Sequence, residues 1–189
     1  MPRTTSQANV DQLVVRARTD GRALGELYEM YYGRILRFCV WRVFSKEAAE
    51  DVTSEVFLGV ARSIGSFDGQ TEERFRNWLY SIAAKLANAH LRKTIRRDEL
   101  LVAAVGRKTL GQADCEQGNP GIDWSVLYGA IRRLKLRQQE VVTLRFFEQM
   151  THNQIAETLD MKIVTVRVTL SRALARLRKV MRIAPGGGN

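Results

Sequence analysis

The chain has 189 residues, with 30 lysines and arginines against 20 aspartates and glutamates, which gives a formal net charge of +10 at neutral pH. A positive excess of this size indicates a polyanionic partner, nucleic acid before a membrane surface. The sequence has no secretory signal, no apolar run of about 20 residues and no disulfide framework, since its two cysteines are Cys39 and Cys115. Because it also lacks ligand-spaced histidines, a glycine-rich phosphate loop and paired carboxylates, we expect no catalytic site, metal, cofactor or membrane insertion.

The N-terminal part of the chain is predicted to be helical. Residues 1–9 are polar and are expected to be disordered. Apolar periodicity predicts helices over about 10–18 and 22–44. The buried side of the second helix is expected to carry Leu24, Leu27, Tyr28, Tyr31, Ile35, Phe38 and Cys39. Prolines occur only at positions 2, 120 and 185, so long helices are not interrupted, and no alternating strand pattern competes with them.

A third helix, predicted over about 46–64 with Ser45 as its N-cap, has an unusual acidic face. Asp51, Glu55 and Leu58 recur at steps of three and four residues, so they share a side of the helix. One interpretation is an ordinary solvated face. The other is a docking surface for a basic partner, because an acidic pair beside an exposed leucine is uncommon on so basic a protein.

The segment Gly65-Ser-Phe-Asp-Gly69 breaks the helical pattern, and a fourth helix is predicted over about 72–95. Aromatic residues alternate here with polar and basic ones, a mixture that suits single-stranded DNA because bases stack and phosphates are neutralised. Aromatic residues at helical spacing are more often core residues, and Phe75 and Trp78 are expected to be largely buried. The polar and basic set comprises Arg76, Asn77, Lys85, Asn88, His90, Arg92 and Lys93.

A second helical block follows a segment rich in glycine, residues 98–122, which is predicted to be a flexible linker. Residues 151–182 have the pattern of a DNA-binding helix-turn-helix. Thr151 is a suitable N-cap with Gln154 at the capping-box position, and Asp160 stands at the turn, where left-handed backbone geometry is needed.

The second helix of this motif separates an apolar stripe from a basic face. The stripe comprises Ile163, Val166, Leu170, Leu174, Leu177 and Met181, and the opposite face comprises Thr165, Val168, Thr169, Arg172, Arg176 and Lys179. Short polar and methyl groups followed by arginines suit a helix that reads base edges and binds phosphates. The alternative is an ordinary amphipathic helix with a solvated basic face.

Three segments, in this order, resemble bacterial RNA polymerase sigma factors of the extracytoplasmic-function (ECF) group. They are residues 49–57 (AEDVTSEVF), residues 75–83 (FRNWLYSIA) and residues 134–147 (LKLRQQEVVTLRFF) with the helix-turn-helix after them. The resemblance covers about residues 22–182 and implies an all-α fold of two small helical domains joined by a flexible linker. The expected domains are residues 10–97, which dock on polymerase and open the −10 element, and residues 123–183, which read the −35 element.

The resemblance also implies the partners and the location of the chain. These are core RNA polymerase and promoter DNA, as a duplex upstream and a melted strand downstream. They also include an anti-sigma factor, which in this family can hold a cytoplasmic sigma factor at the membrane.

Carried over residue by residue, the resemblance assigns three sets of site residues. The polymerase-docking set is Asp51, Glu55, Phe57 and Leu58. The −10 set is Asp68, Arg74, Arg76, Asn77, Trp78, Lys85, Asn88, Arg92 and Lys93. The −35 set is Lys162, Thr165, Arg167, Val168, Thr169, Arg172 and Arg176.

The chain departs from the family pattern at several of these positions. Ser54 stands where glutamine is usual before the docking glutamate, and Lys85 stands where asparagine is frequent. In the helix-turn-helix, Asp160 replaces a common glycine and Thr169 a frequent arginine, so the promoter preference is expected to differ from that of relatives.

Two other classes of protein fit parts of the sequence. A stand-alone helix-turn-helix regulator would leave the acidic face and the aromatic, basic helix without a role. A nuclease would need clustered acidic or histidine ligands for metal-assisted hydrolysis, which the sequence does not offer.

Overall fold

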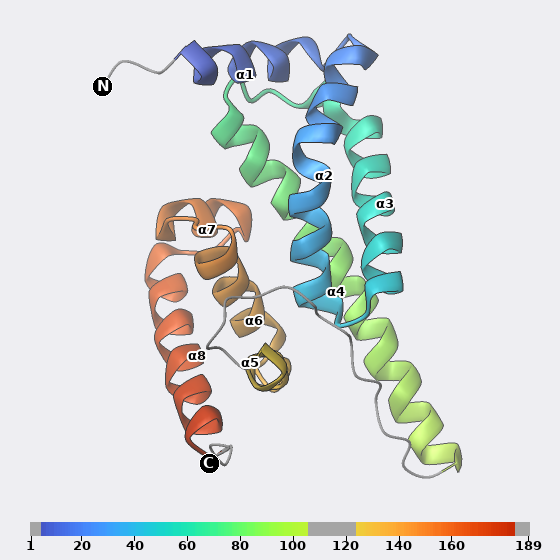
Figure 1. The fold of residues 1–189 in the computed structure, drawn as a ribbon, viewed down its shortest axis with the longest axis vertical. Helices are drawn as coiled ribbons and strands as arrows, with labels where there is room; N and C mark the ends of the chain where they lie inside the picture. The colour runs from blue at the N-terminus through green and yellow to red at the C-terminus, as the bar shows by residue number, and fades with distance from the viewer. Residues whose placement is uncertain (1–4, 106–123, 184–189) are drawn as a thin grey trace.

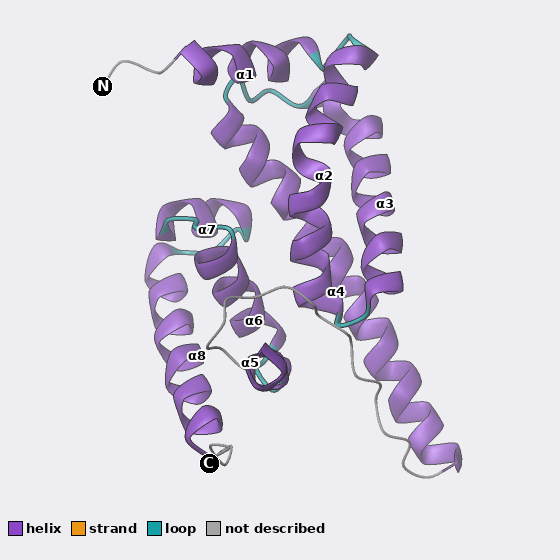
Figure 2. Ribbon diagram, viewed as in Figure 1, coloured by secondary structure: helices purple, strands orange, loops and turns teal. Residues whose placement is uncertain are grey.

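The computed structural model describes residues 5–105 and 124–183 of the chain, and every regular element in these ranges is helical (Figures 1 and 2). The N-terminal part contains α1 (Thr5–Arg16), α2 (Gly21–Val43), α3 (Lys46–Ser63), the short 3-10 turn η1 (Ile64–Ser66) and α4 (Glu72–Val105). The C-terminal part contains α5 (Trp124–Arg132), α6 (Leu136–Val142), the π-helical turn η2 (Thr143–Phe147), α7 (His152–Thr158) and α8 (Ile163–Ile183). The expectation of an all-α protein with two helical domains is confirmed.

The first domain is a bundle in which α2 packs against both α3 and α4, and α1 lies across one end (Figure 1). Its core is aromatic as well as aliphatic. Phe38 and Tyr80 meet edge to face at 5.3 Å, and Tyr31 and Phe75 at 5.5 Å, all four within 1% of complete burial. Burying one such ring stabilises the fold by about 1.5–3 kcal/mol relative to leaving it exposed, so these pairs fix how α2 and α4 cross.

Local signals in the sequence set the helix boundaries. The Ser45 hydroxyl accepts a hydrogen bond from the Ala48 amide at 3.3 Å, as predicted for the N-cap of α3. The predicted capping box at α7 is confirmed, since Thr151 and Gln154 exchange side-chain to backbone hydrogen bonds of 3.3 and 2.8 Å. Asp160 adopts a φ of 50° between α7 and α8, which confirms the left-handed turn residue.

Several expectations differ from the structure. Helix α1 begins at Thr5, so residues 5–9 are helical rather than disordered. Helix α4 continues to Val105 instead of ending near residue 95, because nothing before the glycine-rich segment breaks it. Tyr28 is 42% exposed and Trp78 is only half-buried, since each ring lies at the edge of the aromatic core. Most of the predicted linker, residues 106–122, lies outside the described residues.

The two domains contact each other in this structure. Helix α7 packs against α4 (Figure 1), and η2 packs against α2. An aromatic cluster joins the other end of the contact, where Trp41 of α2 lies 4.2 Å from Phe147 and 4.9 Å from Tyr128 between ring centroids. The described part of the chain contains no helix that is long and apolar enough to cross a membrane.

Candidate nucleic-acid interface

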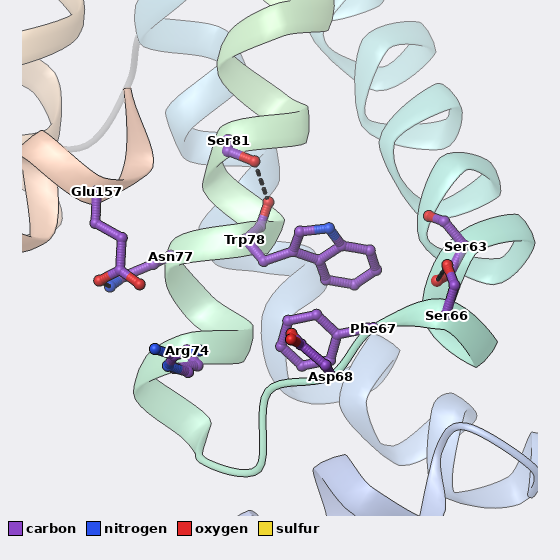
Figure 3. A pocket seen from close by; sticks show the side chains of 9 residues that line it. All are labelled: Ser63, Ser66, Phe67, Asp68, Arg74, Asn77, Trp78, Ser81 and Glu157. Atoms are coloured by element: carbon purple, nitrogen blue, oxygen red, sulfur yellow. Dashed lines mark hydrogen bonds between the residues drawn. The ribbon is translucent and has the colours of Figure 1, made fainter. Parts of the chain in front are cut away.

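An open pocket of about 350 Å³ lies where the loop after η1 meets the start of α4 (Figure 3). Its floor is aromatic, because the rings of Phe67 and Trp78 stack with their centroids 4.6 Å apart and their planes at 23°. Asp68, Arg74 and Asn77 surround this floor. The pocket therefore offers a stacking surface together with a carboxylate, a guanidinium and an amide, the groups that recognise an unpaired base.

The loop that carries Phe67 is held from two sides. The carbonyl of Gly69 accepts a hydrogen bond from the Arg18 guanidinium at 2.6 Å. A Cβ atom at position 69 would overlap the Phe67 ring, so a glycine is needed for the ring to reach its place over Trp78. The pocket thus depends on a backbone approach that only glycine allows.

The first turn of α4 is fixed by side chains from elsewhere in the domain. The Asp11 carboxylate of α1 accepts a hydrogen bond from the Glu72 amide at 2.7 Å, and Thr71 accepts one from the Arg74 amide at 3.3 Å. These contacts satisfy amides that have no partner within the helix. Tyr31 donates to the Glu72 carboxylate at 2.9 Å, and burial raises the pKa of Tyr31, so this phenol stays protonated.

The other predicted −10 residues are divided by the structure. Lys85, Asn88 and Arg92 line a second pocket of about 410 Å³ farther along α4. Lys93 is exposed outside both pockets. Arg76 also lies outside both pockets and is half-buried, with its charge close enough to act on the Tyr31 and Tyr80 phenols.

Sequence reasoning missed several residues of these pockets. Phe67 was part of a segment identified only as a helix break, although an aromatic residue between two glycines could have marked a binding loop. Ser63, Ser66 and Ser81 complete the first pocket. Glu157 lines both pockets from α7, and Arg137 and Glu140 line the second pocket from α6. No local sequence pattern could have identified Glu157, Arg137 and Glu140, because packing of the second domain brings them to the pockets.

The acidic face of α3 is exposed as expected. Asp51 and Glu55 are both exposed, and Leu58 is 55% exposed beside them. Phe57 differs from these three, because it is half-buried and its ring packs against Tyr28 at 4.8 Å and Tyr32 at 6.3 Å. The face is therefore a carboxylate pair with a leucine, supported from beneath by an aromatic cluster.

The helix-turn-helix leaves the expected face of α8 open. Lys162, Thr165, Arg167, Val168, Arg172 and Arg176 are exposed. Thr169 is half-buried, so its side chain lies nearer the edge of this face than its centre. On the opposite side Val166, Leu170 and Leu177 are buried, whereas Ile163 and Met181 at the two ends of the predicted stripe are 39% and 45% exposed.

The described residues also limit other kinds of site. Within residues 5–105 and 124–183, no group of three or more histidine, cysteine, aspartate or glutamate side chains is placed to hold a metal ion. Cys39 is fully buried beneath α3, and burial raises its pKa to about 11. Cys115 lies outside the described residues.

Comparison with known proteins gives matches to two family models. Residues 27–97 match sigma-70 region 2, and residues 125–177 match sigma-70 region 4. Among curated proteins, the ECF RNA polymerase sigma factor BldN of Streptomyces coelicolor is 32% identical over 178 residues, which cover 92% of this chain and 67% of BldN. The RNA polymerase sigma factor YlaC of Bacillus subtilis is 28% identical over 163 residues, covering 84% of this chain and 92% of YlaC.

Two solved structures share the fold. The sigma factor RpoE of Bartonella quintana, in complex with the anti-sigma factor NepR, superposes with a TM-score of 0.69 at 18% identity and covers 85% of this chain and 97% of its own. CnrH, in complex with the cytosolic domain of CnrY, gives a TM-score of 0.68 at 19% identity and covers 92% of this chain and 97% of its own.

Proposed function

The chain belongs to the ECF group of RNA polymerase sigma factors, which direct core polymerase to promoters, and we propose that it divides this work between its two helical domains. The observation that supports the division best is the presence of two separate nucleic-acid surfaces. One is the aromatic pocket at the start of α4, and the other is the exposed face of α8. The first suits an unpaired base, and the second suits the major groove of duplex DNA.

Polymerase docking is assigned to the acidic face of α3. Asp51 and Glu55 would pair with basic groups of the polymerase, and Leu58 would supply apolar contact between them. Phe57 is a supporting residue in this proposal, because its ring packs on Tyr28 and holds α3 against α2.

Strand opening is assigned to the residues of α4, and of the loop before it, that line the two pockets. A base released from the duplex would enter the first pocket and stack on the ring pair of Phe67 and Trp78, with Asn77 and Arg74 as hydrogen-bond donors. Lys85 and Arg92, farther along the helix, would neutralise the phosphates of the same strand.

Upstream recognition is assigned to α8. Thr165, Arg167 and Val168 lie on its first exposed turns, where a recognition helix reaches base edges. Arg172 and Arg176 follow one and two turns later and would hold phosphates.

The same proposal covers location and regulation. A chain of this kind acts as a transcription factor in the cytoplasm and not as an enzyme. We further expect an anti-sigma partner, since the sigma factor RpoE of Bartonella quintana, which shares this fold, was solved in complex with the anti-sigma factor NepR.

In vitro transcription with core polymerase and a random promoter library tests the proposal, and the same experiment identifies the promoter sequence. Selective transcription that depends on this chain is the expected result. A stand-alone helix-turn-helix regulator would instead bind duplex DNA without polymerase and would not co-purify with the core enzyme. Failure of both transcription and co-purification would refute the proposal.

A further inference from the structure

Carboxylates of the second domain lie on the α4 face that carries the strand-binding residues. Asn77 donates a hydrogen bond to Glu157 of α7 at 2.9 Å, and Figure 3 shows the two side chains end to end beside α4. One turn later Tyr80 donates to Glu148, and farther along the same face Asn88 donates to Glu140 of α6. Positions 77, 80 and 88 recur at helical spacing, so the second domain covers one continuous stripe of α4.

Two arginines of α2 extend this set of contacts. The guanidinium of Arg34 lies 3.6 Å from the Glu148 carboxylate. Arg42, which is fully buried, donates to Asn88 at 2.6 Å and to Gln139 of α6 at 2.8 Å. Two residues of the expected −10 set, Asn77 and Asn88, are thus already hydrogen-bonded to carboxylates of the second domain.

From this arrangement, and on the basis of the proposed function, we infer that the free protein is self-inhibited. We call Glu140, Glu148 and Glu157 the acidic seam. We call the arrangement in which the second domain packs on α2 and α4 the closed form. In the closed form the acidic seam occupies the place of a melted DNA strand on α4, so the closed form and strand binding exclude each other. The chemistry supports the exchange, because amide, phenol and guanidinium groups donate hydrogen bonds to a phosphate as well as to a carboxylate.

The closed form is held by apolar contact at one end. Tyr128 of α5 lies against Trp41 and meets Phe44 edge to face at 5.1 Å, and its hydroxyl donates to the Val40 carbonyl at 2.8 Å. Trp41 also packs on Phe147 of η2. These ring contacts fix the position of the second domain on α2, and in this position the acidic seam lies against α4.

The polar part of the contact destabilises the closed form. Among the described residues, the Nε atom of Arg42 and the Oδ1 atom of Asn77 are buried without a hydrogen-bond partner. Arg42 is fully buried, so keeping its charge away from water costs free energy, and burial lowers its pKa to about 10. A contact with such costs is suited to a state that opens when polymerase and DNA offer better partners, rather than to a permanent fold.

The closed form leaves the upstream-reading face free. Arg167, Arg172 and Arg176 of α8 are exposed, and α8 lies on the side of the second domain away from α2 and α4 (Figure 1). Self-inhibition should therefore affect binding of the melted strand and leave binding of the duplex −35 element unchanged. This difference provides an internal control for any variant.

The test compares the wild-type full chain with the double variant E148Q/E157Q, which keeps the size of both side chains but removes their charge. Fluorescence anisotropy measures the affinity for a labelled nontemplate strand of a promoter selected in the transcription screen, and for its duplex −35 element. Because apparent affinity scales with the fraction of open protein, a shift from about 10% open to fully open raises strand affinity about tenfold. Duplex affinity should not change.

A matched control removes the effect of net charge. The variant E47Q/E50Q makes the same change in charge at two exposed positions of α3, away from the acidic seam. It should bind the strand as wild type does. An equal gain in both variants, or no gain in E148Q/E157Q, would overturn the inference.

A second measurement needs no change at the acidic seam. Dyes are attached to cysteines placed at Ala61 of α3 and Ala175 of α8, both exposed, in a Cys115→Ser background in which Cys39 stays buried. Adding the strand should lower energy transfer between the dyes, since strand binding and opening are linked reciprocally. Constant transfer at strand saturation would also overturn the inference. Promoter-directed transcription by the holoenzyme does not require the closed form, so it would persist in that case and the proposed function would stand.

Discussion

Reversing the charges of Asp51 and Glu55 to lysine gives the sharpest test of the docking face. Both side chains are exposed on α3, and neither forms a hydrogen bond or ion pair with another described residue. The change replaces one like-charged pair, four residues apart, with another, so helix stability should shift by no more than about 0.5 kcal/mol. The fold should therefore survive the double substitution.

Binding to polymerase should respond much more strongly. Loss of one member of a desolvated charge pair at an interface costs about 2–5 kcal/mol, and even the lower figure corresponds to about a 30-fold loss of affinity. Reversal adds repulsion to that loss. Surface-immobilised core polymerase, titrated with wild type and variant at one salt concentration, would measure the effect, and thermal unfolding followed by circular dichroism would confirm that the variant is folded.

The control is the variant E26K/E50K, which makes the same change in net charge on α2 and α3. Glu26 and Glu50 are also exposed. Glu26 lies on a different helix from the docking face, and Glu50 is turned about 100° around α3 from Asp51. The control should bind core polymerase within about threefold of wild type, since surface substitutions away from a contact act within about 0.5 kcal/mol. If D51K/E55K binds as well as this control, the acidic face is only a solvated surface and the docking assignment is wrong.

Three further predictions concern other parts of the chain. Thr169→Arg should add a two-hydrogen-bond contact to guanine, worth about 1–3 kcal/mol of discrimination, and change one position of the selected −35 sequence, whereas Arg176→Ala should weaken all sequences alike; an unchanged sequence logo for Thr169→Arg would show that this residue does not reach the bases. Gly69→Ala should reduce promoter opening without affecting −35 duplex binding, because its methyl group would displace the aromatic ring that forms the pocket floor, and permanganate footprinting of the open complex would measure this. Burial raises the pKa of Cys39 from 9.0 to about 11, so its contribution to the free energy of unfolding is complete below pH 9, declines up to about pH 11 and amounts to about 2–3 kcal/mol. Denaturant unfolding of the Cys115→Ser protein and of its Cys39→Ala derivative would measure this. If the free energy of unfolding falls equally steeply with alkaline pH in both proteins, the assignment is wrong.

Local features of the protein were determined by the sequence alone. The helix starts at Ser45 and Thr151 and the left-handed turn at Asp160 were predicted because each depends on a few neighbouring residues. The exposed face of α8 was predicted for a similar reason, since helical periodicity fixes which side chains point away from an apolar stripe.

Sequence reasoning fails where the helical periodicity is correct but burial depends on which other helices pack nearby. Tyr28 shares the phase of buried residues in α2, yet it is exposed, because α3 covers that face only in part and brings Phe57 against the ring edge. Helix α4 extends past its predicted end to Val105, because its sequence contains no strong stop signal.

The strand-binding pockets depended on the tertiary structure. Phe67 and Trp78 are eleven positions apart and stack only because Gly69 lets the loop fold back onto α4. No sequence pattern places Glu148 or Glu157 near α4, and they meet it because the second domain packs on α2, where Tyr128 contacts Trp41 and Phe44. Sequence periodicity determines which face of a helix is apolar, but long-range packing decides which other helix covers it, and here that packing places carboxylates over the residues proposed to bind DNA.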